Sequence, residues 1–150
     1  EKTSYPSNKG GFEKAFLEFL DKDSKVLKFI KILEFKHDFA TISYFRDDGL
    51  MASYYPDFMI ETQKNIYLVE TKSDKDLKDT NVKQKQKSTL DFVKRINNLS
   101  EELREFKTWA YLLLGETQFY SLVKSGADIE DLANSAKMNE ATFTGSLFDL

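Results

Sequence analysis

Residues 54–61 read YYPDFMIE, and residues 66–72 read IYLVETK. Both stretches carry bulky residues at nearly every position, as strands covered on both faces do. Charged residues interrupt them at Asp57 in the first stretch and at Glu70 and Lys72 in the second. A carboxylate and an ammonium group on a buried strand are costly unless they pair or bind something. The two stretches therefore predict neighbouring strands that end in a polar site.

The loop between these strands decides which side chains face one another. If Lys64 and Asn65 form a two-residue hairpin loop, Thr62 faces Tyr67. A three-residue loop without a bulge would shift the pairing by one residue and turn one strand's side chains to the opposite face. The register is therefore a condition that any site built from both strands must meet.

In the register set by a two-residue loop, Asp57 faces Lys72 and Met59 faces Glu70. Asp57, Glu70 and Lys72 then share one face of the sheet, because alternate residues of a strand point to the same side. Glu70 lies diagonal to Asp57, and such diagonals are about 7 Å at the backbone. The two carboxylates are thus expected to converge on a single ion.

The rest of the chain predicts an α/β fold, in which a central mixed sheet is flanked by helices. The expected helices cover residues 11–21, 82–106 and 116–124. The long helix shows an apolar stripe that includes Leu99 and Leu103. The expected strands cover residues 39–45, 52–61, 66–71 and 109–114, and residues 26–35 are either a strand or a helix-to-strand passage.

The length of 150 residues predicts a single domain, with a core over about 12–125 and a tail over 126–150. The first residue is Glu1 rather than Met, which suggests a fragment of a larger polypeptide. The chain lacks cysteine, and its one histidine, His37, reads as a loop residue between strands. Thiolate chemistry and sites that need two histidines are therefore excluded. Carboxylates and lysines remain, and they suit a hard, oxygen-bound metal ion.

Phosphodiester hydrolysis is the chemistry that this set of groups serves. Asp57 and Glu70 can hold Mg²⁺ and leave water positions open, and the carbonyl of Thr71 can supply a further ligand. The ion withdraws charge from the phosphate and lowers the pKa of a bound water molecule. Lys72 can orient that water or neutralise charge on the attacked phosphate.

These residues also resemble a known family. Pro56-Asp57 followed by Glu70-Thr71-Lys72 resembles the signature of the PD-(D/E)XK nuclease superfamily. The sequence of residues 54–58 and 68–72 is similar to that of the C-terminal endonuclease domain of the restriction subunit of type III restriction-modification enzymes. The resemblance runs from residue 12 to residue 119 and includes FEK at 12–14, ISY at 42–44 and WAYL at 109–112.

The resemblance implies a restriction-endonuclease-like (PD-(D/E)XK) fold and Mg²⁺-dependent cleavage of double-stranded DNA, with Mn²⁺ as a substitute ion. Asp57 and Glu70 would be metal ligands and Lys72 the catalytic lysine. Glu13 matches the first-helix carboxylate that joins the metal site in many members, while Glu18 lies on a different helix face. The family works with a helicase-like motor domain, which uses ATP, and with a methyltransferase subunit. A cytoplasmic protein of a bacterium or archaeon, without a membrane partner, is implied.

The sequence also suggests which residues touch DNA. A lysine-rich run follows the second strand, and within it Lys75, Gln84 and Lys85 are candidate phosphate contacts. Because aspartates interrupt the run, a solvated loop and helix start fit it equally well. The net charge of −3 indicates that other domains supply much of the grip on nucleic acid. A silent nuclease-fold module that docks DNA or subunits, and a structural domain with surface ion pairs, are the alternatives.

Overall fold

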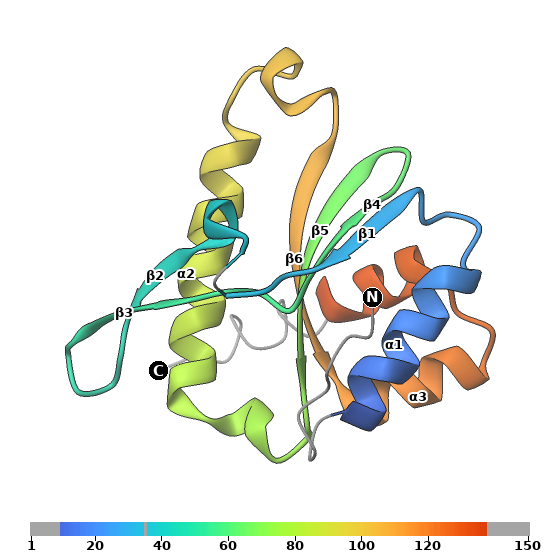
Figure 1. The fold of residues 1–150 in the computed structure, drawn as a ribbon, viewed down its shortest axis with the longest axis horizontal. Helices are drawn as coiled ribbons and strands as arrows, with labels where there is room; N and C mark the ends of the chain where they lie inside the picture. The colour runs from blue at the N-terminus through green and yellow to red at the C-terminus, as the bar shows by residue number, and fades with distance from the viewer. Residues whose placement is uncertain (1–9, 35, 138–150) are drawn as a thin grey trace, which may run out of the picture.

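The computed structural model describes residues 10–34 and 36–137, in which four strands form a mixed sheet in the order β1-β4-β5-β6 (Figure 1). Strands β1 and β4 are antiparallel to their neighbours, while β5 and β6 run parallel. A separate two-stranded sheet pairs β2 with β3. The strands are β1 (Lys28–Lys31), β2 (Ile42–Phe45), β3 (Met51–Tyr54), β4 (Phe58–Glu61), β5 (Asn65–Lys72) and β6 (Thr108–Gly115).

Helices cover both faces of the four-stranded sheet (Figure 1). One face carries α1 (Gly10–Lys22) and α3 (Glu116–Lys124), and the other carries α2 (Thr80–Asn97) together with β2 and β3. Short 3₁₀ helices occur at Asp38–Ala40, Asp76–Lys78 and Glu102–Arg104. The predicted α/β class, with a mixed sheet between helices, is confirmed.

The two faces bury separate apolar clusters, because alternate residues of each strand point to opposite sides. Aromatic rings dominate the cluster under α1 and α3, where Phe16 packs edge-to-face on Phe58 with ring centroids 5.1 Å apart. Leu68 and Tyr111 belong to the cluster under α2. Bulky residues on successive positions of β5 and β6 are therefore explained by coverage on both sides.

The strand predicted over residues 52–61 is wrong, because the chain forms two strands there. Tyr54 ends β3 in the cluster under α2, while Phe58 begins β4 in the opposite cluster. Pro56 lies between them, and proline has no N–H to donate to a sheet ladder. The break leaves Asp57 just before β4, where its carbonyl accepts a hydrogen bond from Ile32 N at 2.9 Å.

The long helix predicted over residues 82–106 is also too long, since α2 ends at Asn97. The Asn97 side chain donates to the carbonyl of Trp109 and accepts from its N–H, both at 2.8 Å. This bracket fixes the helix end against β6. Leu99 and Leu103, predicted on the buried stripe, lie beyond it with exposed fractions of 49% and 74%.

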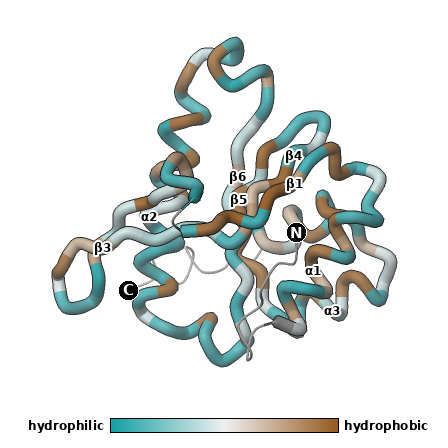
Figure 2. The backbone as a smooth tube through the Cα atoms, in the orientation of Figure 1, coloured by the Kyte–Doolittle hydropathy of each residue, from teal (hydrophilic) through white to brown (hydrophobic). Residues whose placement is uncertain are grey.

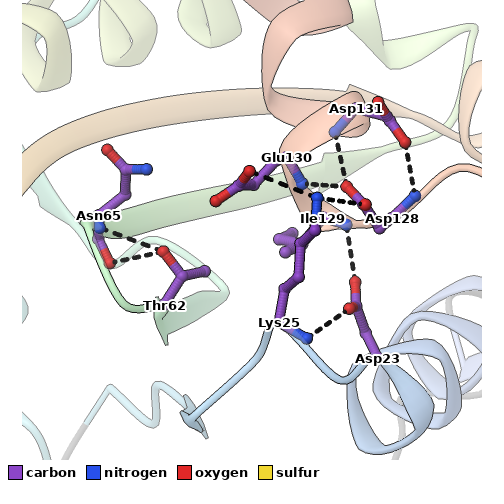
Figure 3. Close-up of polar contacts among 8 residues, drawn as sticks. All are labelled: Asp23, Lys25, Thr62, Asn65, Asp128, Ile129, Glu130 and Asp131. Carbon is purple, nitrogen blue, oxygen red and sulfur yellow. Dashed lines mark hydrogen bonds and ion pairs between the residues drawn. The ribbon is translucent and has the colours of Figure 1, made fainter.

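The core extends beyond residue 125, which was the predicted end. Residues 129–137 are helical, and Ile129, Leu132, Ala133 and Ala136 lie in the cluster under α1 and α3. Asp23 Oδ2 accepts a hydrogen bond from Ile129 N at 2.7 Å, and Lys25 Nζ lies 2.6 Å from Asp128 Oδ2 (Figure 3). These contacts tie the start of this helix to the turn after α1. Residues 138–150 of the predicted tail lie outside the described part.

A substitution at Leu132 tests this extension of the core. Leu132→Ala should lower the free energy of unfolding by about 2–5 kcal/mol, because Leu132 is fully buried and the change leaves a cavity. Asn134→Ala, on the exposed side of the same helix, should change it by less than about 0.5 kcal/mol. Urea unfolding measures both. Equal stability of Leu132→Ala and the parent would mean that residues 129–137 are not part of the domain.

Candidate active site

The hairpin between β4 and β5 sets the geometry of the site, and its register differs from the predicted one. Thr62 pairs with Asn65 rather than with Tyr67: Thr62 N donates to the Asn65 carbonyl at 2.9 Å, and Asn65 N donates to Thr62 Oγ1 at 3.1 Å. The threonine hydroxyl thus closes the turn around residues 63 and 64. The partner of Thr62 on β5 is therefore two residues earlier than the sequence predicted. Tyr67 pairs with Ile60 instead.

A shift of two residues leaves every side chain on its predicted face. The last paired residues are Phe58 and Val69, so Asp57 lies one step further, opposite Glu70 rather than diagonal to it. Met59 pairs with Leu68. The pairing therefore places Asp57 nearer to Glu70 than the diagonal arrangement that the sequence predicted.

Asp57 is held by the strand it faces. Its Oδ2 accepts hydrogen bonds from Thr71 N at 2.7 Å and from Thr71 Oγ1 at 2.8 Å. Both bonds fall on the same carboxylate oxygen. Because the main chain of Asp57 is bonded to Ile32 as well, the residue is fixed between β1 and β5 although it belongs to no strand.

Glu70 is the most buried of the predicted site residues on β5, with 3% of its surface exposed. Its Oε1 lies 2.5 Å from Lys72 Nζ. Its Oε2 is buried and has no hydrogen-bond partner, and the hydroxyl of Tyr111 is in the same condition. A buried carboxylate oxygen without a donor is costly. Glu70 is therefore arranged to receive a cation or a donor from outside the chain.

Burial and the nearby Asp57 carboxylate raise the pKa of Glu70 to about 7, although Lys72 and Lys85 oppose the shift. Burial alone would lower the pKa of Lys72, but attraction to Glu70 and Asp57 outweighs it, so the net pKa is raised. Burial, followed by the charge of Glu70, raises the pKa of the Tyr54 hydroxyl. Lys72 thus stays an ammonium, while Glu70 titrates near neutrality.

An open cleft of about 580 Å³ is lined by Lys72 and by residues of β2, β3 and α2. Three cationic side chains line it, from Arg46, Lys72 and Lys85, together with the carboxylates of Asp76 and Asp79. The sequence analysis missed Arg46, because it belongs to a turn whose position beside the cleft depends on tertiary packing.

Lys85 extends over two aromatic rings inside this cleft. Its Nζ lies 5.3 Å from the ring centroid of Tyr54 and 5.5 Å from that of Tyr44, within the range of a cation–π interaction. Lys85 thus lies in the cleft, and its contact with a phosphate stays a prediction. Gln84 lines a different hollow beside Met51, and Lys75 is exposed before the 3₁₀ helix at Asp76–Lys78.

The structure does not bring Glu13 to the two carboxylates. Glu13 is buried and forms an ion pair with Lys31, which also lies over the Phe58 ring at 5.7 Å. Within residues 10–34 and 36–137 there is no group of three or more acidic or histidine side chains that could hold a metal ion. The predicted part of Glu13 in the metal site is thus not supported by this arrangement.

Comparison with known proteins agrees with this geometry. The model of the family described as TnsA-like endonuclease N terminal matches residues 30–99. The matched segment runs from β1 to just past α2 and contains Asp57, Glu70 and Lys72. The match therefore supports a nuclease domain of the PD-(D/E)XK type. Glu13 lies outside the matched segment.

Two further comparisons gave no relative: neither the curated proteins nor the solved structures contain a match to this nuclease domain. The family match supports the superfamily but not the closer relation to type III restriction subunits. None of the helices in the described part of the chain is long and apolar enough to cross a membrane.

The titration of Glu70 is directly measurable. In EDTA, ¹³C NMR should show one glutamate carboxyl with a midpoint near pH 7 that disappears in Glu70→Gln. Because the folded pKa exceeds the unfolded value of 4.5, protonated Glu70 stabilises the fold below pH 4.5, and this contribution is lost as the pH rises to about 7. Midpoints below pH 5 for every glutamate would contradict the burial argument.

Proposed function

We propose that this domain hydrolyses phosphodiester bonds of double-stranded DNA with Mg²⁺, for which Mn²⁺ substitutes. The observation that carries the proposal is the buried, unpartnered Oε2 of Glu70 opposite Asp57. Carboxylate oxygens are the ligands that these ions prefer, so the donor set fits a hard divalent cation. Asp57 and Glu70 would hold the ion, and the carbonyl of Thr71 is the proposed third protein ligand.

The bound ion would supply charge withdrawal from the phosphate and a lowered pKa for water. The protein's own groups do the rest. Thr71 fixes the Asp57 carboxylate, so this group needs little rearrangement before the reaction. Lys72 stays charged and lines the cleft, where its ammonium can orient water and neutralise charge on the attacked phosphate.

Within this proposal, the domain is the cleavage unit of a type III restriction enzyme in a bacterial or archaeal cytoplasm. The similarity of residues 54–58 and 68–72 to that family supports this closer assignment. The acidic net charge supports delivery to DNA by other domains, here a helicase-like motor that uses ATP and a methyltransferase subunit. Cleavage by the full-length protein that is independent of ATP would contradict the restriction role but not the nuclease.

A silent docking module is the second candidate, favoured by the absence of a third acidic ligand in the described part of the chain. Such a module would bind DNA or a subunit without cutting. Divalent-ion binding separates the two candidates, because only the nuclease needs a competent ion site. Motor domains are not required for that measurement.

The site residues should differ in their phenotypes. Asp57→Asn and Glu70→Gln should weaken Mn²⁺ binding at least tenfold in calorimetry and abolish plasmid cleavage by the full-length protein. Lys72→Ala should keep the ion within a few-fold affinity and lose at least 10² in rate, because it removes the charge beside the phosphate and leaves both carboxylate ligands in place. Glu18→Gln, on the exposed face of α1, is the matched control. Cleavage at the parental rate by Lys72→Ala would refute its role.

Lys85 should contribute to DNA binding through a phosphate contact. In the Asp57→Asn background, which keeps the DNA intact, Lys85→Gln should weaken duplex binding several-fold and reduce the dependence of log K on log salt by about one unit. Lys94→Gln, an exposed position later on α2, serves as the control. Fluorescence anisotropy at several salt concentrations measures both, and equal slopes for parent and Lys85→Gln would assign Lys85 to packing alone.

A further inference from the structure

The loop between α2 and β6 exposes large apolar side chains at the end of the sheet opposite the active site (Figure 1). Leu103 and Phe106 have exposed fractions of 74% and 71%. Apolar and hydrophilic residues alternate along this loop (Figure 2). The loop leads into Thr108, the first residue of β6, which pairs with Asn65 at the start of the parallel strand β5, whereas Glu70 and Lys72 lie at the other end of β5.

The loop is held in one shape rather than left loose. Arg104 Nε donates to the Leu99 carbonyl at 3.1 Å, and its Nη1 donates to the Lys107 carbonyl at 2.8 Å. Lys107 Nζ lies 2.6 Å from the Thr62 carbonyl and 2.7 Å from Glu61. Both cations of the loop are thus used internally to fix its shape.

This shape includes an unfavourable backbone. Glu105 and Phe106 are consecutive residues with φ of 51° and 59°, a region that residues with side chains rarely adopt. Such outliers persist only where surrounding contacts enforce them, and they occur preferentially at functional sites. The strained backbone here presents an exposed aromatic ring, which points to a binding surface.

An apolar groove adjoins this loop. Ile42, Phe92, Ile96 and Leu99 line a hollow of about 570 Å³ between the start of β2 and the end of α2. Arg95 stands at its edge and is exposed. Leu99 belongs to both the groove and the loop, so the two features form one continuous patch.

The charges of the loop and the groove are complementary. Glu101, Glu102 and Glu105 are exposed around Leu103 and Phe106, so the loop presents apolar side chains within an acidic rim. The groove presents an apolar hollow beside an arginine. The acidic rim is unsuited to DNA. A knob and a matching groove on one patch are what a two-fold symmetric interface requires, because each copy then offers both halves.

We propose that this patch joins two copies of the chain. Leu103 and Phe106 of one copy insert into the groove lined by Ile42, Phe92 and Ile96 of the other, and the glutamates of the loop meet Arg95 across the interface. The two-fold axis makes the contact twice. The proposal concerns the surface at the far end of the sheet and does not depend on catalysis.

Sedimentation equilibrium of the chain tests this proposal over a range of concentrations. The parent should show a monomer–dimer equilibrium, and the double change Leu103→Glu, Phe106→Glu should weaken it at least tenfold through lost apolar burial. Leu50→Glu is the matched control, since Leu50 is 62% exposed in the turn between β2 and β3 and belongs to neither the loop nor the groove. A parent that is monomeric at 200 µM, or a dimer unaffected by the double change, overturns the proposal.

Charge reversal gives a second test that misfolding cannot mimic. Arg95→Glu alone should weaken the dimer, and so should the triple change of Glu101, Glu102 and Glu105 to Lys, because each variant places like charges across both contacts. An equimolar mixture of the two variants should associate, since both contacts then pair opposite charges. Circular dichroism confirms that each variant is folded, and a mixture that associates no more than its components overturns the proposed pairing.

Discussion

The central constraint in this domain is the placement of two carboxylates against each other at the end of a buried strand pair. Asp57 lies opposite Glu70, and Glu70 keeps one oxygen buried without a partner. Burial, followed by the like charge of Asp57, raises the pKa of Glu70, and Lys72 compensates only in part. This arrangement is unfavourable by itself, and the proposed divalent ion would relieve both the repulsion between the carboxylates and the missing contact of Glu70 Oε2.

The fold is arranged to hold this unfavourable pair in place. Pro56 ends one strand ladder, so β3 leaves with α2 while β4 joins the four-stranded sheet, and Asp57 remains at the junction. Its carboxylate is fixed by Thr71 and its carbonyl by Ile32. Apolar packing under α1 and α3 on one face and under α2 on the other buries β5 on both sides. Preorganisation of this kind is what electrostatic catalysis requires.

Local patterns predicted the elements well where burial on both faces or a helical period dominated. The strand at residues 109–114 and the helix at 116–124 follow directly from their residues. Asp57, Glu70 and Lys72 share one face as predicted, although the register was wrong, because a shift of two residues does not change the face. The hairpin turn itself was mispredicted, since the hydroxyl of Thr62 captures Asn65. That choice depends on one hydrogen bond, which composition does not reveal.

Tertiary contacts decided the remaining features. An amphipathic stripe continued past Asn97, but the bracket between Asn97 and Trp109 ends the helix and turns Leu103 to the surface. Glu13 matched a family position, yet its partner is Lys31, a residue in an ambiguous stretch. Arg46 lines the cleft because β2 and β3 pack on α2, and no local sequence pattern predicts that packing.

An anomalous difference map from crystals soaked in Mn²⁺ tests the central claim most directly, because it locates the ion without relying on activity. The account predicts a peak within coordination distance, about 2.0–2.3 Å, of one carboxylate oxygen each from Asp57 and Glu70. The account would be contradicted by crystals that were soaked in Mn²⁺ but show no peak between these carboxylates, with Glu70 Oε2 still buried and unpartnered.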